Sequence, residues 1–192
     1  MIFKRRSMFV FAALILCWAL GGEGRSGFGA QETAKRDRTG EASGSDMSGE
    51  EVQKLLREHN RVRSDVGVAP LTWSSSIAAH AQEWANHLAG TDCRMEHRPK
   101  TGKWAGSYGE NLFIGTVGFY GVVDAVQAWE SEKRLYDGGP ISRSNFMKVG
   151  HYTQMVWEDT GEIGCGKTEC EGKVIIVCNY DPPGNVLGEK PY

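Results

Sequence analysis

Apolar residues recur at helical spacing from about residue 50 onward. Ser48 and Glu51 match a capping box, in which each end of a Ser-x-x-Glu segment satisfies a backbone N–H at the start of a helix. An apolar face follows at helical spacing, formed by Val52, Leu55, Leu56, His59 and Val62. Gly67 and Pro70 end this first predicted helix.

Two further helices are predicted downstream. Residues 74–76 offer capping serines, and an apolar stripe then runs to Gly90 through Ile77, Ala78, Ala81, Trp84, Ala85 and Leu88. A third helix is expected from about Gly121 to Tyr136, because Val122, Val126 and Trp129 lie on related faces.

Strand signals are concentrated in the C-terminal third. The segment Tyr152–Trp157 is rich in β-prone residues, and Val174–Cys178 is a short, wholly apolar run typical of a buried strand. Helices come first and strands later, without alternating βαβ units. This order predicts an α+β fold with a largely antiparallel sheet.

Composition narrows the functional classes. The 192 residues include 22 Lys+Arg and 24 Asp+Glu, giving a formal net charge of −2. That balance argues against a protein that binds nucleic acid by neutralising phosphates, which would carry a basic surplus. The 25 glycines have no collagen-like period and indicate many turns and loops. The chain length suits one domain with appendages.

The N-terminus carries a secretory signal pattern. Three basic residues within the first six precede an uninterrupted apolar run over residues 8–20, which is shorter than a membrane-spanning helix. We expect a signal peptide over residues 1–30, with cleavage between residues 19 and 30, and no stable membrane span afterwards. An uncleaved anchor is the alternative, and a lipoprotein through Cys17 is disfavoured by the bulky Leu16 before it. The expected location is extracellular, or periplasmic or cell-envelope in a bacterium.

Residues 31–47 are polar and lack apolar periodicity, so we expect a disordered tether there and a folded domain over residues 48–192. Without residues 1–30, 18 basic and 23 acidic residues remain, a formal charge of −5. Four cysteines also remain, and an even number in an exported domain favours disulfides. A zinc site with four cysteine ligands is the alternative, although the paired C-x2-C spacing is missing. Spacing leaves all three disulfide connectivities open.

Two histidines and two glutamates are candidates for a site. His97 and His151 lie in segments marked by glycine or proline, next to expected loops, whereas His59, His80 and His87 are interpreted as structural.

Glu110 lies in a Gly-Glu-Asn segment. Glu132 shares a helical face with Trp129 and Tyr136, so its carboxylate needs a partner. The two histidines and two glutamates could hold a divalent ion or do acid–base chemistry. The alternative is two Glu–His hydrogen-bonded pairs that orient loops, and spacing alone does not decide.

Several motifs then identify a family resemblance. The segment Gly150-His-Tyr-Thr-Gln-Met-Val-Trp157, followed by Gly164-Cys-Gly166, resembles the first signature of the CAP superfamily of cysteine-rich secretory, antigen 5 and pathogenesis-related 1 proteins. Residues 177–185 (VCNYDPPGN) resemble the second. The resemblance spans about residues 50–192 and is strongest toward plant-type pathogenesis-related protein 1 and short bacterial single-domain members.

The resemblance implies an α–β–α sandwich with a central, mainly antiparallel sheet. It implies that His97, Glu110, Glu132 and His151 line one cavity and that the two histidines bind Zn²⁺ or another divalent cation weakly. It also implies two disulfides, Cys93–Cys170 and Cys165–Cys178.

Three functions are compatible with this resemblance. The first is a secreted, non-catalytic, monomeric module that binds a sterol, a fatty acid, a divalent metal or an extracellular protein, with a role in defence or interaction. The second is a metal-assisted hydrolase or protease using Glu110 and Glu132, which we rank lower because no H-E-x-x-H or G-x-S-x-G motif is present. The third is a precursor of a C-terminal signalling peptide.

Overall fold

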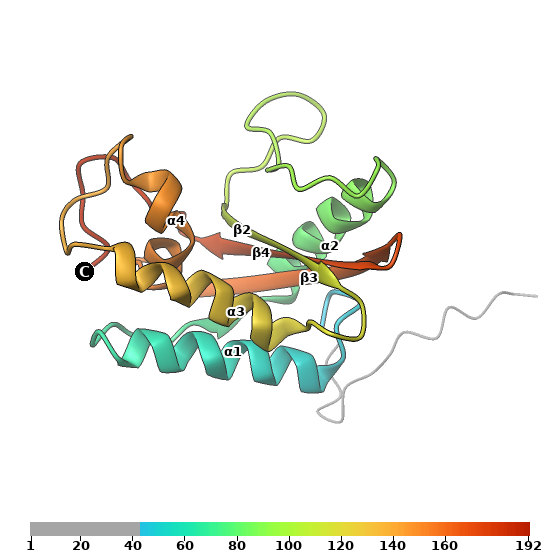
Figure 1. Cartoon of the computed structure of the whole chain (residues 1–192), viewed down its shortest axis with the longest axis horizontal. Coiled ribbons are helices and arrows are strands. Elements are labelled where there is room, and N and C mark those ends of the chain that lie inside the picture. Colours follow the sequence, from blue (N-terminus) through green and yellow to red (C-terminus); the bar gives the residue numbers. More distant parts are fainter. Residues whose placement is uncertain (1–42) are drawn as a thin grey trace, which may run out of the picture. The chain divides into compact units, whose positions relative to one another are not determined.

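The computed structural model describes residues 43–192, which are coloured in Figure 1. The signal peptide expected over residues 1–30, and the tether as far as residue 42, lie outside the described residues. The last residues of the expected tether pack on the domain. Met47 is only 2% exposed, and the indole N–H of Trp73 donates to the carbonyl of Ser43 at 3.0 Å. The folded domain therefore begins before Ser48.

A four-stranded sheet forms the centre of the domain. Its strands run in the order β1 (Thr72–Trp73), β3 (Glu162–Cys170), β4 (Lys173–Asp181) and β2 (Gly109–Thr116). Only β1 and β3 pair in parallel; the other neighbours are antiparallel.

Helices cover both faces of this sheet. In Figure 1, α2 (Ser75–Ala89) lies on one side, and α1 (Gly49–Ser64) and α3 (Val122–Glu130) lie on the other. The short 3₁₀ helix η1 (Ser131–Leu135) continues from α3, and α4 (Phe146–Met155) packs against it. The α–β–α sandwich with a mainly antiparallel sheet is thus confirmed. No helix within residues 43–192 is long and apolar enough to cross a bilayer.

The apolar run in β4 is explained by this layering. Alternate side chains point to opposite faces of a strand. Val174, Ile176 and Cys178 enter the core shared with α1 and α3, whereas Ile175 and Val177 pack with α2. Because both faces are buried, the strand shows no polar alternation, and the strand predicted over residues 174–178 is confirmed.

The predicted helices form, with one change at an end. The capping box is present: the backbone N–H of Ser48 donates to Glu51 Oε2 at 2.8 Å, and the N–H of Glu51 donates to the Ser48 hydroxyl at 3.3 Å. The second helix ends at Gly90 as expected. The third is α-helical only to Glu130, beyond which residues 131–135 tighten into the 3₁₀ turn.

The strand predicted over Tyr152–Trp157 is wrong, because most of this segment belongs to α4. Tyr152, Met155 and Val156 are fully buried, at the i, i+3, i+4 spacing of a helix face. Packing of this face against the core overrides the β propensity of tyrosine, valine and tryptophan.

Two glycines in β3 allow α2 to pack directly on the sheet. A Cβ at Gly164 would lie 2.1 Å from the backbone nitrogen of Ala78, and one at Gly166 would lie 2.4 Å from the backbone of Gln82. Only glycine permits such an approach. Between them, Cys165 points to the opposite face, where it pairs with Cys178.

The four cysteines of the domain form two disulfides, Cys93–Cys170 and Cys165–Cys178, the pairing that the family resemblance implies. Cys165 and Cys178 are directly opposite each other on β3 and β4. Cys93 and Cys170 join the loop after α2 to the end of β3. The Cys93–Cys170 bridge thereby anchors the start of the loop that carries His97.

Candidate functional site

The first half of the candidate site is an exposed histidine that is hydrogen-bonded to a buried carboxylate. Nδ1 of His97 is 2.8 Å from Oε1 of Glu110, and the same oxygen accepts the backbone N–H of Arg98 at 2.9 Å. The His97 side chain is 62% exposed, whereas that of Glu110, in β2, is 7% exposed. The sheet therefore fixes the carboxylate, and the carboxylate orients a solvent-accessible imidazole.

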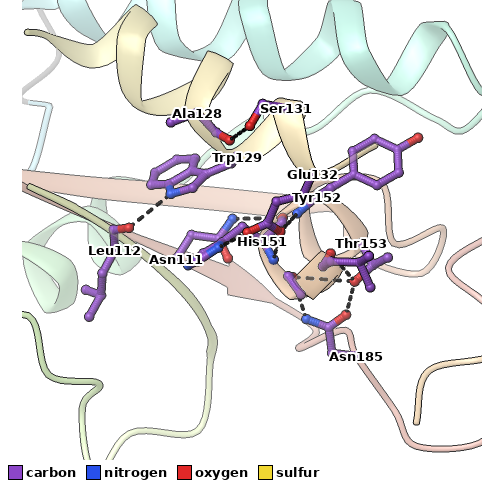
Figure 2. A network of polar contacts seen from close by, with 12 residues as sticks. Asn111, Leu112, Ala128, Trp129, Ser131, Glu132, His151, Tyr152, Thr153 and Asn185 are labelled. Carbon is purple, nitrogen blue, oxygen red and sulfur yellow. Dashed lines mark hydrogen bonds and ion pairs between the residues drawn. The ribbon is translucent and has the colours of Figure 1, made fainter. Parts of the chain in front are cut away.

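The second half repeats this arrangement with different elements. Nδ1 of His151, in α4, is 2.6 Å from Oε1 of Glu132, in η1 (Figure 2). The other oxygen of Glu132 accepts the backbone N–H groups of His151 at 2.9 Å and Tyr152 at 3.2 Å. The ring of Trp129 lies nearly parallel to that of His151, 6.4 Å away between centroids. His151 is thus helical, not in the loop environment that the sequence suggested.

The structure contains the two Glu–His pairs that the sequence left as an alternative to a joint site. An ionised carboxylate can only accept hydrogen bonds, so Nδ1 of each neutral histidine carries the proton. Nε2 of each ring is then left with a free lone pair, the form in which imidazole binds metals.

One cleft brings most of these groups together. His97, Glu110 and His151 line it, whereas Glu132 does not and holds His151 from outside the lining. The cleft has a volume of about 80 Å³, room for an ion with its waters but below the ~300 Å³ of a typical site for a drug-sized ligand. Within residues 43–192, no three His, Cys, Asp or Glu side chains lie close enough together to hold a metal ion.

Asn111 connects the cleft to the core, a role that sequence reasoning missed. Its side-chain amide donates to the carbonyl of His151 at 3.0 Å and to the hydroxyl of Tyr180 at 3.1 Å (Figure 2 shows the contact with His151). The Tyr180 hydroxyl in turn lies 2.9 Å from Nε2 of His59. The available signal was a polar residue directly before the apolar run Leu112–Ile114, a position that needs a buried partner.

Burial strongly lowers the pKa of His59, the histidine at the core end of this network. His59 is fully buried, and burial lowers its pKa to about 4, against the partly opposing hydrogen bond to the carbonyl of Leu55. His59 is therefore neutral at pH 7 and acts as a structural group, as the sequence suggested.

The remaining walls of the cleft come from α4 and from the C-terminal segment after β4, residues 182–192. Phe146 and Met147 line it and are 41% and 84% exposed, so they form an apolar rim. Asn185, from the C-terminal segment, also lines it. Its amide oxygen accepts the Thr153 hydroxyl at 2.6 Å, and its amide nitrogen donates to the carbonyl of Gly150 at 2.8 Å (Figure 2). The C-terminal segment is thus part of the site.

Comparisons with known proteins agree with this architecture. The profile of the "Cysteine-rich secretory protein family" (CAP) matches residues 56–180. Over 141 residues the chain is 43% identical to pathogenesis-related protein 1B of Nicotiana tabacum, covering 73% of this chain and 80% of that protein. Pathogenesis-related protein PRMS of Zea mays is also 43% identical, over 143 residues, covering 73% of this chain and 81% of its own.

Solved structures give the same fold. The crystal structure of NaASP2 with Zn²⁺ superposes with a TM-score of 0.63 at 26% identity, covering 76% of this chain and 86% of that one. Venom allergen-like protein 4 of Schistosoma mansoni superposes with a TM-score of 0.54 at 28% identity, covering 76% and 95%. By the family profile and by its similarity to plant pathogenesis-related 1 proteins, this chain belongs to the CAP family of cysteine-rich secretory proteins.

Proposed function

We propose that this protein is a secreted, non-catalytic binding domain of the defence type, whose cleft takes a divalent cation, foremost Zn²⁺, on Nε2 of His97 and His151. One observation carries the proposal. Both histidines have Nδ1 committed to a glutamate, and both line the same cleft with Nε2 uncommitted. Neutral imidazole oriented in this way by a carboxylate is a common arrangement around protein-bound zinc.

The donor set fits a weak site. Two imidazoles supply half of the four ligands that zinc usually takes, which leaves positions for water or for a ligand from outside. The absence of a compact group of three donors within residues 43–192 agrees with low affinity in this conformation. The relative NaASP2, whose crystal structure contains Zn²⁺, adds support from the family.

The carboxylates favour binding over catalysis. Glu132 accepts three hydrogen bonds and Glu110 accepts two short ones on a single oxygen. A general base must be free to take a proton from its substrate. Since both carboxylates instead orient histidines, we propose no hydrolase or protease activity.

The apolar rim gives the cleft a second property. Phe146 and Met147 offer exposed hydrophobic surface beside the histidines. A sterol is too large for a cleft of about 80 Å³. An adjoining hollow of about 260 Å³, which shares His97, Glu110, Phe146 and Asn185 with the cleft, is also below the ~300 Å³ of a typical site for a drug-sized ligand. We propose that a fatty acid or sterol contacts this rim rather than entering the cleft.

Secretion is proposed from the signal pattern of residues 1–30 and from the two disulfides, since disulfides persist in oxidising compartments. It is tested by expressing the full-length chain and determining the N-terminus of the protein recovered from the medium. Retention in the cell with residue 1 intact would refute it.

Zinc titration by calorimetry tests the cleft directly. We expect saturable binding that is abolished in the double variant His97→Ala/His151→Ala and retained in His87→Ala. The latter control removes an imidazole that stacks on Trp84 and lies tilted against Trp104, outside the cleft. Binding that survives the double variant, or turnover of casein or an ester that disappears with Glu110→Ala, would overturn the proposal.

A further inference from the structure

Two buried polar atoms beside Glu110 have no hydrogen-bonding partner within the described residues. They are Nε2 of His80 and Oδ1 of Asn179. Both residues line one small cavity, to which Glu110 also contributes but His97 and His151 do not. Asn179 as a whole is only 2% exposed. Buried polar atoms in proteins are nearly always paired, so two such atoms on one cavity indicate a bound molecule.

The volume of the cavity and the residues that line it indicate which kind of molecule it can hold. Its volume of about 10 Å³ is that needed by one water. A cation is disfavoured because two basic residues, Arg98 and Lys100, line the same cavity. An anion is disfavoured by the carboxylate of Glu110 and the amide oxygen of Asn179. Water is neutral and can both donate and accept, which these partners require.

We propose that one ordered water links His80, Asn179 and Glu110. The water accepts the N–H of His80 Nε2 and donates one hydrogen to Oδ1 of Asn179. Its second hydrogen goes to Oε2 of Glu110, whose contact with the Asn179 amide nitrogen is long, at 3.5 Å. Three hydrogen bonds are the usual number for a buried water.

His80 and Asn179 are then positioning residues for the candidate site. Oε1 of Glu110 is held by His97 and the backbone of Arg98, and the water holds the other oxygen. With both oxygens fixed, the carboxylate keeps the proton of His97 on Nδ1. This positioning role rests on the proposed function, in which His97 Nε2 binds the cation. The presence of the water does not depend on that function.

A substitution at Gly106 removes the water without replacing any of its three partner residues. A Cβ at Gly106 would lie 3.3 Å from Nε2 of His80 and 3.1 Å from Cδ of Arg98, so Gly106→Ala fills the cavity. His80→Phe removes the imidazole, and His80→Gln restores a side-chain amide of similar reach. Gly161→Ala is the matched control, because a Cβ there meets nothing within 4 Å.

A crystal structure at a resolution that shows ordered water tests the site. In the wild type we expect a water about 2.7–3.2 Å from Nε2 of His80 and from Oδ1 of Asn179. We expect the same water in His80→Gln, bonded to the introduced amide and to Asn179, and no water in Gly106→Ala. A dry cavity in the wild type, or a direct bond between the two side chains, would overturn the proposal.

Zinc titration and ¹⁵N NMR of the His97 ring test the positioning role. Residues that orient metal ligands typically contribute about 10- to 100-fold to metal affinity. We therefore expect zinc affinity to fall about tenfold in His80→Phe and in Gly106→Ala. The affinity should stay near the wild-type value in His80→Gln and in the control Gly161→Ala. Equal affinity in all variants would refute the role. If the wild type binds no zinc, the proposed function fails, whereas the water is still tested by the crystal structure. The ring spectrum also still reports whether His97 loses its Nδ1–H tautomer in His80→Phe and Gly106→Ala; an unchanged tautomer in both would refute the role.

Discussion

The hydroxyl of Tyr180 donates a hydrogen bond to Nε2 of His59, 2.9 Å away in the centre of the core. The direction follows from the other ring nitrogen: Nδ1 of His59 lies 2.9 Å from the carbonyl of Leu55, which can only accept. Asn111 then donates to the same hydroxyl and to the backbone of His151. A buried histidine is therefore linked by two side chains to the helix that carries the candidate ligand.

This histidine predicts a loss of stability in mild acid. The pKa of His59 is about 4 in the fold and near 6.5 when unfolded, so the unfolded chain takes up the proton first as pH falls. The contribution is intact above pH 6.5 and decreases from there toward pH 4, by about 3 kcal/mol in total. Urea unfolding of the wild type and His59→Gln between pH 7 and 4 measures it. Equal pH slopes in the two proteins would contradict the assignment.

Replacing the buried Arg63 should destabilise the fold strongly, because its guanidinium donates hydrogen bonds to several backbone carbonyls. Its guanidinium is buried and donates to four carbonyls at 2.6–2.9 Å, those of Ala69, Met155, Trp157 and Thr160. Arg63→Met should lower the free energy of unfolding by at least about 3 kcal/mol, because these buried acceptors lose their donors.

Arg61, on the same helix, is the control. It is exposed and pairs with Glu58 and Glu130, so Arg61→Met should cost no more than about 1 kcal/mol. Chemical denaturation measures the free energy of unfolding of both variants. Similar losses in the two would show that the hydrogen bonds of Arg63 to the backbone do not contribute to stability as proposed.

The sequence predicted those features that depend on local residues. The capping box at Ser48 and the apolar run in β4 carry their signal within a few positions. The helical conformation of Tyr152–Met155 was missed because it is set by packing of Tyr152 and Met155, which no local propensity encodes.

The site shows the same division. The four candidate residues were identified, but their pairing across 13 and 19 positions depends on how β2, η1 and α4 meet. The unpaired atoms of His80 and Asn179 arise from tertiary packing, and the sequence contained no sign of them.

The glycines of β3 predict an intolerance to a single methyl group. Gly164→Ala would place a Cβ 2.1 Å from backbone, so α2 must move away from the sheet. We expect a loss of about 3 kcal/mol, at the upper end for overpacking. Gly161→Ala, three residues earlier and in open space, should change stability by less than about 1 kcal/mol. Thermal unfolding distinguishes the two, and a tolerated Gly164→Ala would refute the close approach.

Peptide mapping without reduction should recover Cys93 linked to Cys170 and Cys165 linked to Cys178. The first bridge spans 77 positions and the second 13, and loop-closure entropy assigns them about 4 and 3 kcal/mol respectively. Replacing the first pair by alanine should therefore lower the urea midpoint of unfolding. Recovery of a Cys165–Cys170 peptide would contradict the pairing.

The C-terminal segment bears on whether this protein could also act as a peptide precursor. Its backbone is tied to the domain by bonds between Ile141 and Glu189, Gly188 and Ile141, and Glu158 and Pro191, all at 2.7–2.8 Å. Asn185, within the segment, lines the cleft and anchors α4. Liberating the peptide would therefore remove one wall of the proposed cation site, and a molecule that had released it would no longer bind there. Cation binding and peptide release would then exclude each other: a molecule could bind the cation only before cleavage, and cleavage would be irreversible.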